Sequence, residues 1–211
     1  MEGALREGGH EPGLKLIETL GWDGARLVRG ERHLARLARS AAMLGWGCDV
    51  NQARDRLVAG HEGPARLRLT LDASGQIEVT SAPVSPVSAP WRIMVARDRL
   101  AASDPWLRLK TTRRALYDRA RASLAAGVDE VLFLNDRGVV CEGTITNVFL
   151  ETDSTFVTPR LASGLLPGIL REELLATGQA REGDLTPADL AAGRIWVGNS
   201  LRGLIPAVLV G

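Results

Sequence analysis

The spacing of apolar residues changes twice within the first 80 residues, and this change restricts the chain to folds that combine helices with strands. Residues 14–20 have the composition of a strand, whereas residues 31–44 carry apolar side chains three or four positions apart, as on one face of a helix. Residues 66–71 and 76–80 alternate apolar and polar side chains on either side of an Asp-Ala-Ser-Gly turn. We therefore expect an α+β fold that contains an amphipathic helix and a hairpin with one face in water.

The rest of the chain continues this mixture. A turn at Trp22-Asp-Gly-Ala25 predicts a second short strand at residues 26–29, which would form a hairpin with the first strand. Gly127 closes a predicted helix at residues 115–126, and Thr186 is a good N-cap with a proline after it at the first helical position. Further strands are expected at residues 91–96, 130–135, from 139 onward, 147–151, 156–159 and 194–197, and further helices at residues 51–59 and 169–176.

A proline-rich segment and the pair Asp104-Pro105 indicate where one predicted domain ends and the next begins. Residues 82–90 contain three prolines and keep no alternation, which is typical of a connector. We expect an N-terminal α+β domain at residues 1–100, a connector at residues 101–109 and a β-rich α+β domain at residues 110–211.

Composition excludes several classes of protein. Apolar residues make up 45% of the chain and charged residues 24%, and the formal net charge is +1, so neither nucleic acid nor a membrane is an expected partner. Cys48 and Cys141 lie far apart and in no metal-ligand spacing, so we expect no metal site and a reducing compartment. No apolar run is long enough to span a bilayer. The sequence predicts a soluble, cytoplasmic protein.

Lysine is rare in this chain, and its placement suggests chemistry. Of 26 cationic residues only Lys15 and Lys110 are lysine, and Lys110 follows Arg108 and precedes Arg113 and Arg114. Unlike arginine, lysine can become a free amine when other cations crowd it, which makes Lys110 a candidate nucleophile. The alternative is an ordinary solvated cation.

Two further features in the second half fit a bound cofactor. Glu142 lies in an otherwise neutral strand, where a carboxylate needs a partner such as a protonated pyridine nitrogen. The segment before Ile169 and Leu170 opens a helix whose first N–H groups could hold a phosphate, and Ser200 adds a hydroxyl from a second loop. Each feature has an ordinary alternative: a carboxylate in water, a simple turn or a capping serine.

Taken together and in this order, these segments resemble the class IV (fold-type IV) pyridoxal-phosphate enzymes, which include branched-chain and D-amino-acid aminotransferases and aminodeoxychorismate lyase. The resemblance covers nearly the whole chain after residue 13. The matching segments are Leu16-Ile-Glu-Thr-Leu20, Arg32-His-Leu-Ala-Arg-Leu37, Lys110-Thr-Thr-Arg-Arg114, Asp129-Glu-Val-Leu-Phe-Leu-Asn135, Glu142-Gly-Thr-Ile-Thr-Asn147, Leu165-Leu-Pro-Gly-Ile-Leu-Arg171 and Asn199-Ser-Leu-Arg-Gly203.

The resemblance implies a fold and a set of roles. It implies two α+β domains of the D-amino-acid aminotransferase type with pyridoxal 5'-phosphate between the domains, usually in a homodimer with active sites near the subunit interface. Lys110 would bond the cofactor covalently and move the substrate's Cα proton, and Glu142 would pair with the pyridine nitrogen. The phosphate would be bound by Arg36, by the backbone of Ile169 and Leu170, and by Ser200.

The chain departs from the aminotransferase pattern at one position that contacts the cofactor. Those enzymes typically place a tyrosine five residues after the lysine, where this chain has Ala115, and its single tyrosine is Tyr117. Arg114 could occupy that space, as in the lyases, or could be a solvated helical residue. Arg202 is the candidate for a substrate carboxylate, and its alternative is a surface charge after a turn.

These features predict an enzyme with a small-molecule substrate. The expected reaction is that of a 4-amino-4-deoxychorismate lyase, which releases pyruvate and 4-aminobenzoate for folate biosynthesis. The alternative is a class IV aminotransferase (a transferase) acting on branched-chain or D-amino acids, because both reactions use the same cofactor residues. A non-enzymatic alternative takes the arginine-rich residues 26–39 as a nucleic-acid patch, but Glu31 interrupts it and the net charge is near zero.

Overall fold

The computed structural model describes residues 2–153 and 155–210, and the chain divides into two compact units. Unit 1 contains the residues up to Pro86 together with Leu109–Arg113, and unit 2 contains Val87–Arg108 and the residues from Arg114 onward. This division differs from the predicted boundary near residue 100. Strand β4 (Trp91–Leu100) pairs with strands of unit 2, whereas the segment that holds Lys110 pairs with a strand of unit 1.

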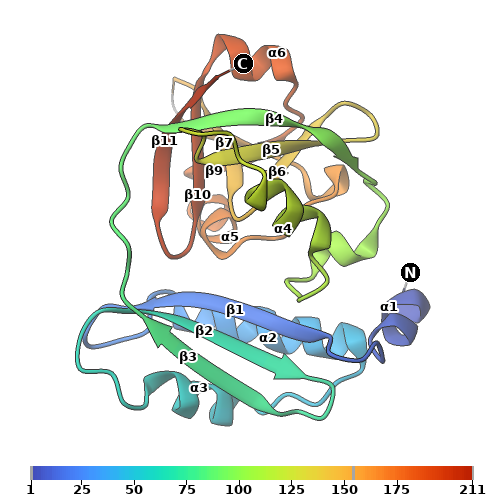
Figure 1. Ribbon diagram of the computed structural model, residues 1–211, viewed down its shortest axis with the longest axis vertical. Helices are drawn as coiled ribbons and strands as arrows, with labels where there is room; N and C mark the ends of the chain where they lie inside the picture. The colour runs from blue at the N-terminus through green and yellow to red at the C-terminus, as the bar shows by residue number, and fades with distance from the viewer. Residues whose placement is uncertain (1, 154, 211) are drawn as a thin grey trace. The chain divides into compact units, whose positions relative to one another are not determined.

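Unit 1 is an antiparallel sheet with two helices packed on it and a third, α1, packed against α2 (Figure 1). The predicted hairpin between the first strand and residues 26–29 is wrong: Trp22 and Leu27 form only an isolated bridge, and β1 pairs along its whole length with β2. Arg29 adopts a left-handed φ of 55°, which ends the extended chain just before α2 begins. The strands are β1 (Lys15–Trp22), β2 (Ala65–Asp72) and β3 (Ile77–Ala82), and the helices are α1 (Glu2–Gly8), α2 (Gly30–Leu44) and α3 (Val50–Val58).

The amphipathic helix is confirmed as α2. Its apolar stripe, which includes Leu34, Leu37 and Ala41, is fully buried, and α2 packs against β1. Arg36 lies off this stripe and is nevertheless buried, with an exposed fraction of 5%. A buried guanidinium needs an opposite charge or hydrogen-bond acceptors beside it, and those of Arg36 belong to the candidate site.

Unit 2 is built on an eight-stranded mixed sheet. The ladder closes on itself because β10 pairs with both β11 and β7, so that β10, β11, β4, β5, β6 and β7 form a ring, while β8 and β9 continue from β7 (Figure 1). The remaining strands are β5 (Glu130–Asn135), β6 (Val140–Gly143), β7 (Asn147–Glu151), β8 (Phe156–Pro159), β9 (Ala180–Gly183), β10 (Arg194–Asn199) and β11 (Gly203–Leu209). The helices are η1 (Pro105–Arg108), α4 (Ala115–Ala122), η2 (Leu161–Ser163), α5 (Ile169–Ala176) and α6 (Pro187–Ala192).

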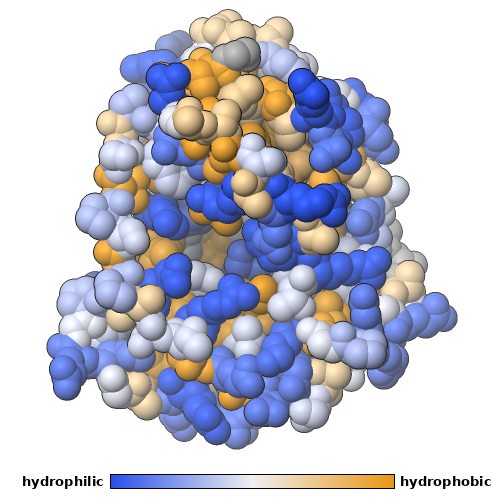
Figure 2. Space-filling model, viewed as in Figure 1, coloured by the Kyte–Doolittle hydropathy of each residue, from blue (hydrophilic) through white to orange (hydrophobic). Residues whose placement is uncertain are grey.

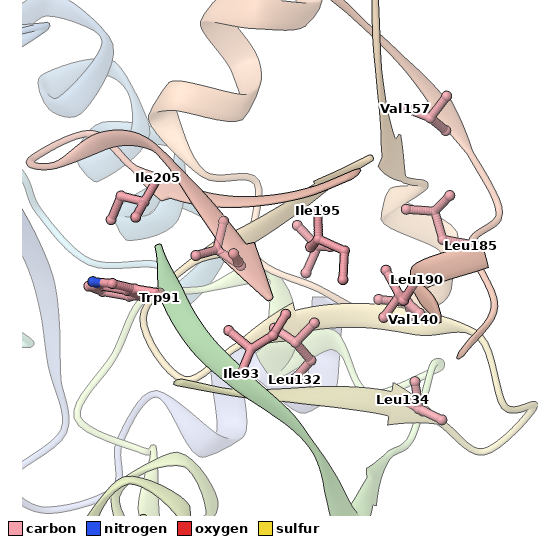
Figure 3. Packing of buried hydrophobic residues seen from close by; sticks show 13 residues of the cluster. Trp91, Ile93, Leu132, Leu134, Val140, Val157, Leu185, Leu190, Ile195 and Ile205 are labelled. Carbon is pink, nitrogen blue, oxygen red and sulfur yellow. The ribbon is translucent and has the colours of Figure 1, made fainter. Parts of the chain in front are cut away.

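Strand β5 has apolar contacts on both faces. Leu132 and Leu134 pack into the main core together with Ile93 and Ile195 (Figure 3), whereas Phe133 packs on the other face with Cys141. The apolar side of α4 packs on this second face, so α4 covers β5 and β6 there.

Several elements differ from their predicted extents. Helix α4 ends at Ala122, four residues before the predicted end, and α1, β9 and β11 were not predicted. The N-cap at Thr186 is confirmed, with a full capping box to Asp189.

Among the residues that the structure describes, no helix combines the length and the apolar character needed to cross a membrane. On the face seen in Figure 2, hydrophilic residues predominate and apolar ones stand in small groups.

Candidate active site

The predicted site residues are distributed over both units. Unit 1 holds Arg36 and Lys110. Unit 2 holds Glu142, Ile169, Leu170, Ser200 and the two candidate substrate arginines, Arg114 and Arg202.

The backbone of Lys110 is held along the edge of β1. The Ile17 amide donates to the Lys110 carbonyl over 2.8 Å, and the Thr112 amide donates to the Lys15 carbonyl over 2.9 Å. Leu16 and Thr111 form an isolated antiparallel bridge between these two bonds. The residues on both sides of Leu109–Arg113 belong to unit 2. This short segment is therefore an excursion of the chain into unit 1, where it pairs with β1.

Arg36 lies in a buried ion-pair network. Its Nε and Nη2 donate to the two carboxylate oxygens of Glu18 over 2.8 and 2.6 Å, and His33 Nδ1 lies 2.6 Å from Glu18 Oε2. Burial would raise the pKa of the Glu18 carboxyl, but the Arg36 charge and the bonds from His33 and Arg36 lower it to about 2. Glu18 therefore stays ionised and fixes the orientation of the guanidinium.

His33, the third member of this network, experiences opposing effects on its pKa. Burial lowers the pKa of His33, its bond to Glu18 raises it, and the positive charges of Arg36 and Lys110 lower it further. The Lys110 charge is the smallest of these influences. Glu18 and His33 were not predicted, although both lie within segments that carry the family resemblance.

In unit 2, a β-bulge and two hydrogen bonds set the position of Glu142. Between paired positions, β6 has one more residue than β5, because Leu132 faces Gly143 while Leu134 faces Val140. A bulge of this kind re-aims a side chain. The Glu142 carboxylate, with an exposed residue fraction of 6%, accepts from Tyr117 Oη over 2.7 Å and from the Leu166 amide over 3.1 Å.

A second buried carboxylate builds the turn that follows Glu142. Glu130 is fully buried and accepts five hydrogen bonds, from the amides of Val131, Thr144 and Ile145 and from the hydroxyls of Thr144 and Thr146. A Cβ on Gly143 would lie 2.8 Å from the Glu130 carboxyl carbon, so only glycine fits beside it.

The three predicted cofactor segments of unit 2 meet at this turn. Asn147 Nδ2 donates to the Leu166 carbonyl over 3.1 Å, and Asn199 Nδ2 donates to the Ile145 carbonyl over 3.2 Å. A Cβ on Gly198 would lie 2.9 Å from Leu170 Cδ2, so the strand that precedes Ser200 packs directly on the start of α5. The structure therefore brings together Glu142, the N-terminus of α5 and the Ser200 loop.

The two candidate substrate arginines have defined contacts in unit 2. Arg114 donates to Asp118 over 2.7 Å and to the Thr144 carbonyl over 3.1 Å, and its guanidinium carbon lies 5.7 Å from the centre of the Tyr117 ring. The Arg202 guanidinium carbon lies 5.9 Å from the centre of the Trp91 ring. Arg114 thus contacts Tyr117, which donates to Glu142, and the turn that follows Glu142. The substrate roles of both arginines stay predictions.

These residues fit pyridoxal phosphate by their chemistry. Unit 2 supplies a buried carboxylate for a pyridine nitrogen and a helix N-terminus with a nearby hydroxyl for a phosphate. Unit 1 supplies the amine of Lys110 and the guanidinium of Arg36, and Glu18 fixes the orientation of that guanidinium. Among the described residues, no group of His, Cys, Asp and Glu side chains could hold a metal ion.

Comparison with known proteins agrees with this chemistry. The family model described as "Amino-transferase class IV" matches residues 15–210. A protein of Schizosaccharomyces pombe described as a "putative aminodeoxychorismate lyase" is 30% identical over 207 residues, which cover 92% of this chain and 89% of that protein.

Two solved structures are similar over nearly the whole chain. A "putative amino-acid aminotransferase" from Mesorhizobium loti has a TM-score of 0.89 and 45% identity, and the match covers 93% of this chain and all of that one (100%). The 4-amino-4-deoxychorismate lyase from Pseudomonas aeruginosa has a TM-score of 0.80 and 26% identity, with 92% of this chain and 82% of that chain covered.

Proposed function

Because the chain belongs to the class IV aminotransferase family, whose enzymes depend on pyridoxal 5'-phosphate, we propose that it is a 4-amino-4-deoxychorismate lyase. The reaction would convert 4-amino-4-deoxychorismate into 4-aminobenzoate and pyruvate, which together contain all the atoms of the substrate. The observation that carries this choice is the match to a protein described as an aminodeoxychorismate lyase over 92% of the chain.

The structure supports a distinct task for each cofactor residue. Arg36, fixed by Glu18, would bind the phosphate together with the first N–H groups of α5 and Ser200. Glu142, fixed by Tyr117 and Leu166, would accept the hydrogen bond from the protonated ring nitrogen. When bound, pyridoxal phosphate supplies an electron sink for the carbon that loses a proton.

Lys110 would carry out the proton transfer. Its Nζ would hold the cofactor at rest and, once released by the substrate amine, would take the proton from the carbon that bears this amine. The Lys110 amine would return the proton to the methylene carbon of the enolpyruvyl group as the bond between the ring carbon and the ether oxygen breaks, so that pyruvate leaves and the ring becomes aromatic. Arg202 and Arg114 would bind the substrate's two carboxylates.

An aminotransferase acting on branched-chain or D-amino acids is the second candidate. It is favoured by the 45% identity to the Mesorhizobium loti structure described as an amino-acid aminotransferase. Against it, the position that carries the cofactor-contacting tyrosine in the aminotransferases is Ala115, and Tyr117 is bonded to Glu142 instead. We further propose that the enzyme is a cytoplasmic homodimer, as the family resemblance implies.

A product assay separates the two reactions. We expect the purified holoenzyme to release pyruvate and 4-aminobenzoate in equal amounts from 4-amino-4-deoxychorismate. The Lys110→Ala variant should lose this activity, whereas the Lys15→Ala variant should keep it, because Lys15 pairs with Glu78 on the surface. Absence of pyruvate, with a cofactor spectrum that shifts on adding amino acids and reverts with 2-oxo acids, would establish the aminotransferase instead.

A further inference from the structure

Tyr117 is the single tyrosine of the chain, and its hydroxyl reaches the carboxylate assigned to the cofactor. Tyr117 Oη donates to Glu142 Oε1 over 2.7 Å, while the Leu166 amide donates to Oε2 over 3.1 Å. Because the two donors bind different oxygens, they fix the plane of the carboxylate as well as its position.

The tyrosine ring is itself held in place by its neighbours. It packs edge-on against Phe133, with ring centres 5.2 Å apart, and the Arg114 guanidinium lies over it. Burial raises the pKa of the Tyr117 hydroxyl, and the charge of Glu142 raises it further. The hydroxyl therefore remains a proton donor throughout the physiological range of pH.

Helix α4 is fixed on the Glu142 turn at two further points on the same face. Arg114, three residues before Tyr117, donates to the Thr144 carbonyl over 3.1 Å. Arg121, four residues after Tyr117, donates to the Thr144 hydroxyl over 3.1 Å. Spacings of three and four residues place these side chains on one face of the helix, so α4 holds the turn and its carboxylate as one assembly.

We propose that Tyr117 is a positioning residue that holds the Glu142 carboxylate in the orientation in which it pairs with the ring nitrogen of pyridoxal phosphate. The inference rests on the proposed role of Glu142. Tyr117 acts through Glu142, because a group that binds a ligand must be held to within about 0.5 Å by supporting hydrogen bonds.

Replacement of Tyr117 with phenylalanine removes the hydroxyl and keeps the ring. The measurement is the dissociation constant of pyridoxal phosphate for the apoprotein, obtained by titration. We expect Y117F to bind the cofactor roughly ten-fold more weakly, since hydrogen bonds to charged groups are the stronger kind. An unchanged dissociation constant would overturn the proposal.

A double-mutant cycle tests whether the effect passes through Glu142. In the Glu142→Ala background, we expect Y117F to change the dissociation constant by less than about two-fold, because the acceptor is gone. The same ten-fold loss in both backgrounds would show a general structural effect and would overturn the proposal.

Thr158→Val is the matched control. It removes a buried hydroxyl of the same unit, which donates to the Val148 carbonyl over 2.8 Å and does not contact Glu142. We expect a lower unfolding temperature with unchanged cofactor affinity, and a ten-fold loss of affinity here would contradict the assigned specificity of Tyr117. Cofactor affinity does not depend on which reaction follows, so a failed pyruvate assay would remove the proposed lyase activity and leave this test intact.

Discussion

Glu130 and Glu142 are two buried carboxylates at opposite ends of one short stretch of unit 2, and they are held in different ways. The five hydrogen bonds to Glu130 come from the adjacent residue and from residues 144–146, where they hold the turn between β6 and β7, and Arg121 on α4 adds an ion pair at 3.7 Å. The donors to Glu142 include Tyr117 on α4 and Leu166 in the segment before α5.

This difference indicates that Glu130 stabilises the fold, whereas Glu142 is oriented by the residues around it. Glu130 satisfies a cluster of backbone and threonine donors that would otherwise be buried without partners. Glu142 is held by α4 and by the segment that leads into α5, whose first residues, Ile169 and Leu170, are predicted to bind the phosphate. Loss of Glu130 should therefore mainly affect stability, and loss of Glu142 should mainly affect chemistry.

Glu130→Ala should have the largest effect. It leaves the turn donors without an acceptor in a fully buried site, and we expect the free energy of unfolding to fall by roughly 3–5 kcal/mol. Chemical denaturation of the apoprotein measures this loss. A loss below about 1 kcal/mol would contradict the structural role of Glu130.

Glu18→Gln extends the comparison to the carboxylate of unit 1. The substitution leaves buried Arg36 without its counter-charge, so we expect a loss of about 3 kcal/mol at pH 7. Because the pKa of Glu18 is lowered from 4.5 to about 2, its ionised form contributes fully above pH 4.5, and the contribution is lost as the pH falls toward 2.

The stability difference between wild type and Glu18→Gln should therefore be constant from pH 7 to 5 and shrink between pH 4.5 and 2, where the folded-state pKa lies. Urea denaturation at a series of pH values gives this curve. A difference that does not change down to pH 2 would mean that the Glu18 charge is not what holds Arg36.

Glu142→Ala should change turnover more than stability. We expect catalysis to slow roughly 100-fold, which corresponds to about 2.7 kcal/mol, while the cofactor remains bound at saturating concentration. Steady-state kinetics of the holoenzyme provides the test, with Glu130→Ala assayed below its unfolding temperature for comparison. Unchanged turnover would remove the role assigned to Glu142.

Thr146→Val should have the smallest effect. It removes one of the five bonds to Glu130, and the Ile145 amide still donates to the same oxygen over 3.2 Å. We expect a loss of about 1 kcal/mol in unfolding free energy without a change in cofactor affinity. A loss as large as that of Glu130→Ala would indicate that the bonds to this carboxylate do not contribute separately.

The sequence predicts helices and strands well where the spacing of apolar residues is regular. It predicts them poorly where a strand depends on pairing with residues far away in the chain. The α2 stripe and the β2–β3 hairpin follow from spacing alone. Strand β11 escapes prediction because Pro206 lies within it, and its extended form depends on pairing with β10 and β4.

The site is predictable only as separate segments. Residue spacing and the family resemblance indicate Lys110, Arg36 and Glu142, because each lies in a recognisable motif. The contact between Tyr117 and Glu142 spans 25 residues and depends on a bulge in β6, and the Glu18 network depends on helix–sheet packing. Neither leaves a periodic signal in the sequence.

Borohydride reduction of the holoenzyme, followed by mass spectrometry of its peptides, tests most directly which amine holds the cofactor. Reduction fixes the cofactor permanently to the amine that holds it. We expect a pyridoxyl group on Lys110, whose backbone lies beside β1. A pyridoxyl group on Lys15, the only other lysine, would contradict this expectation.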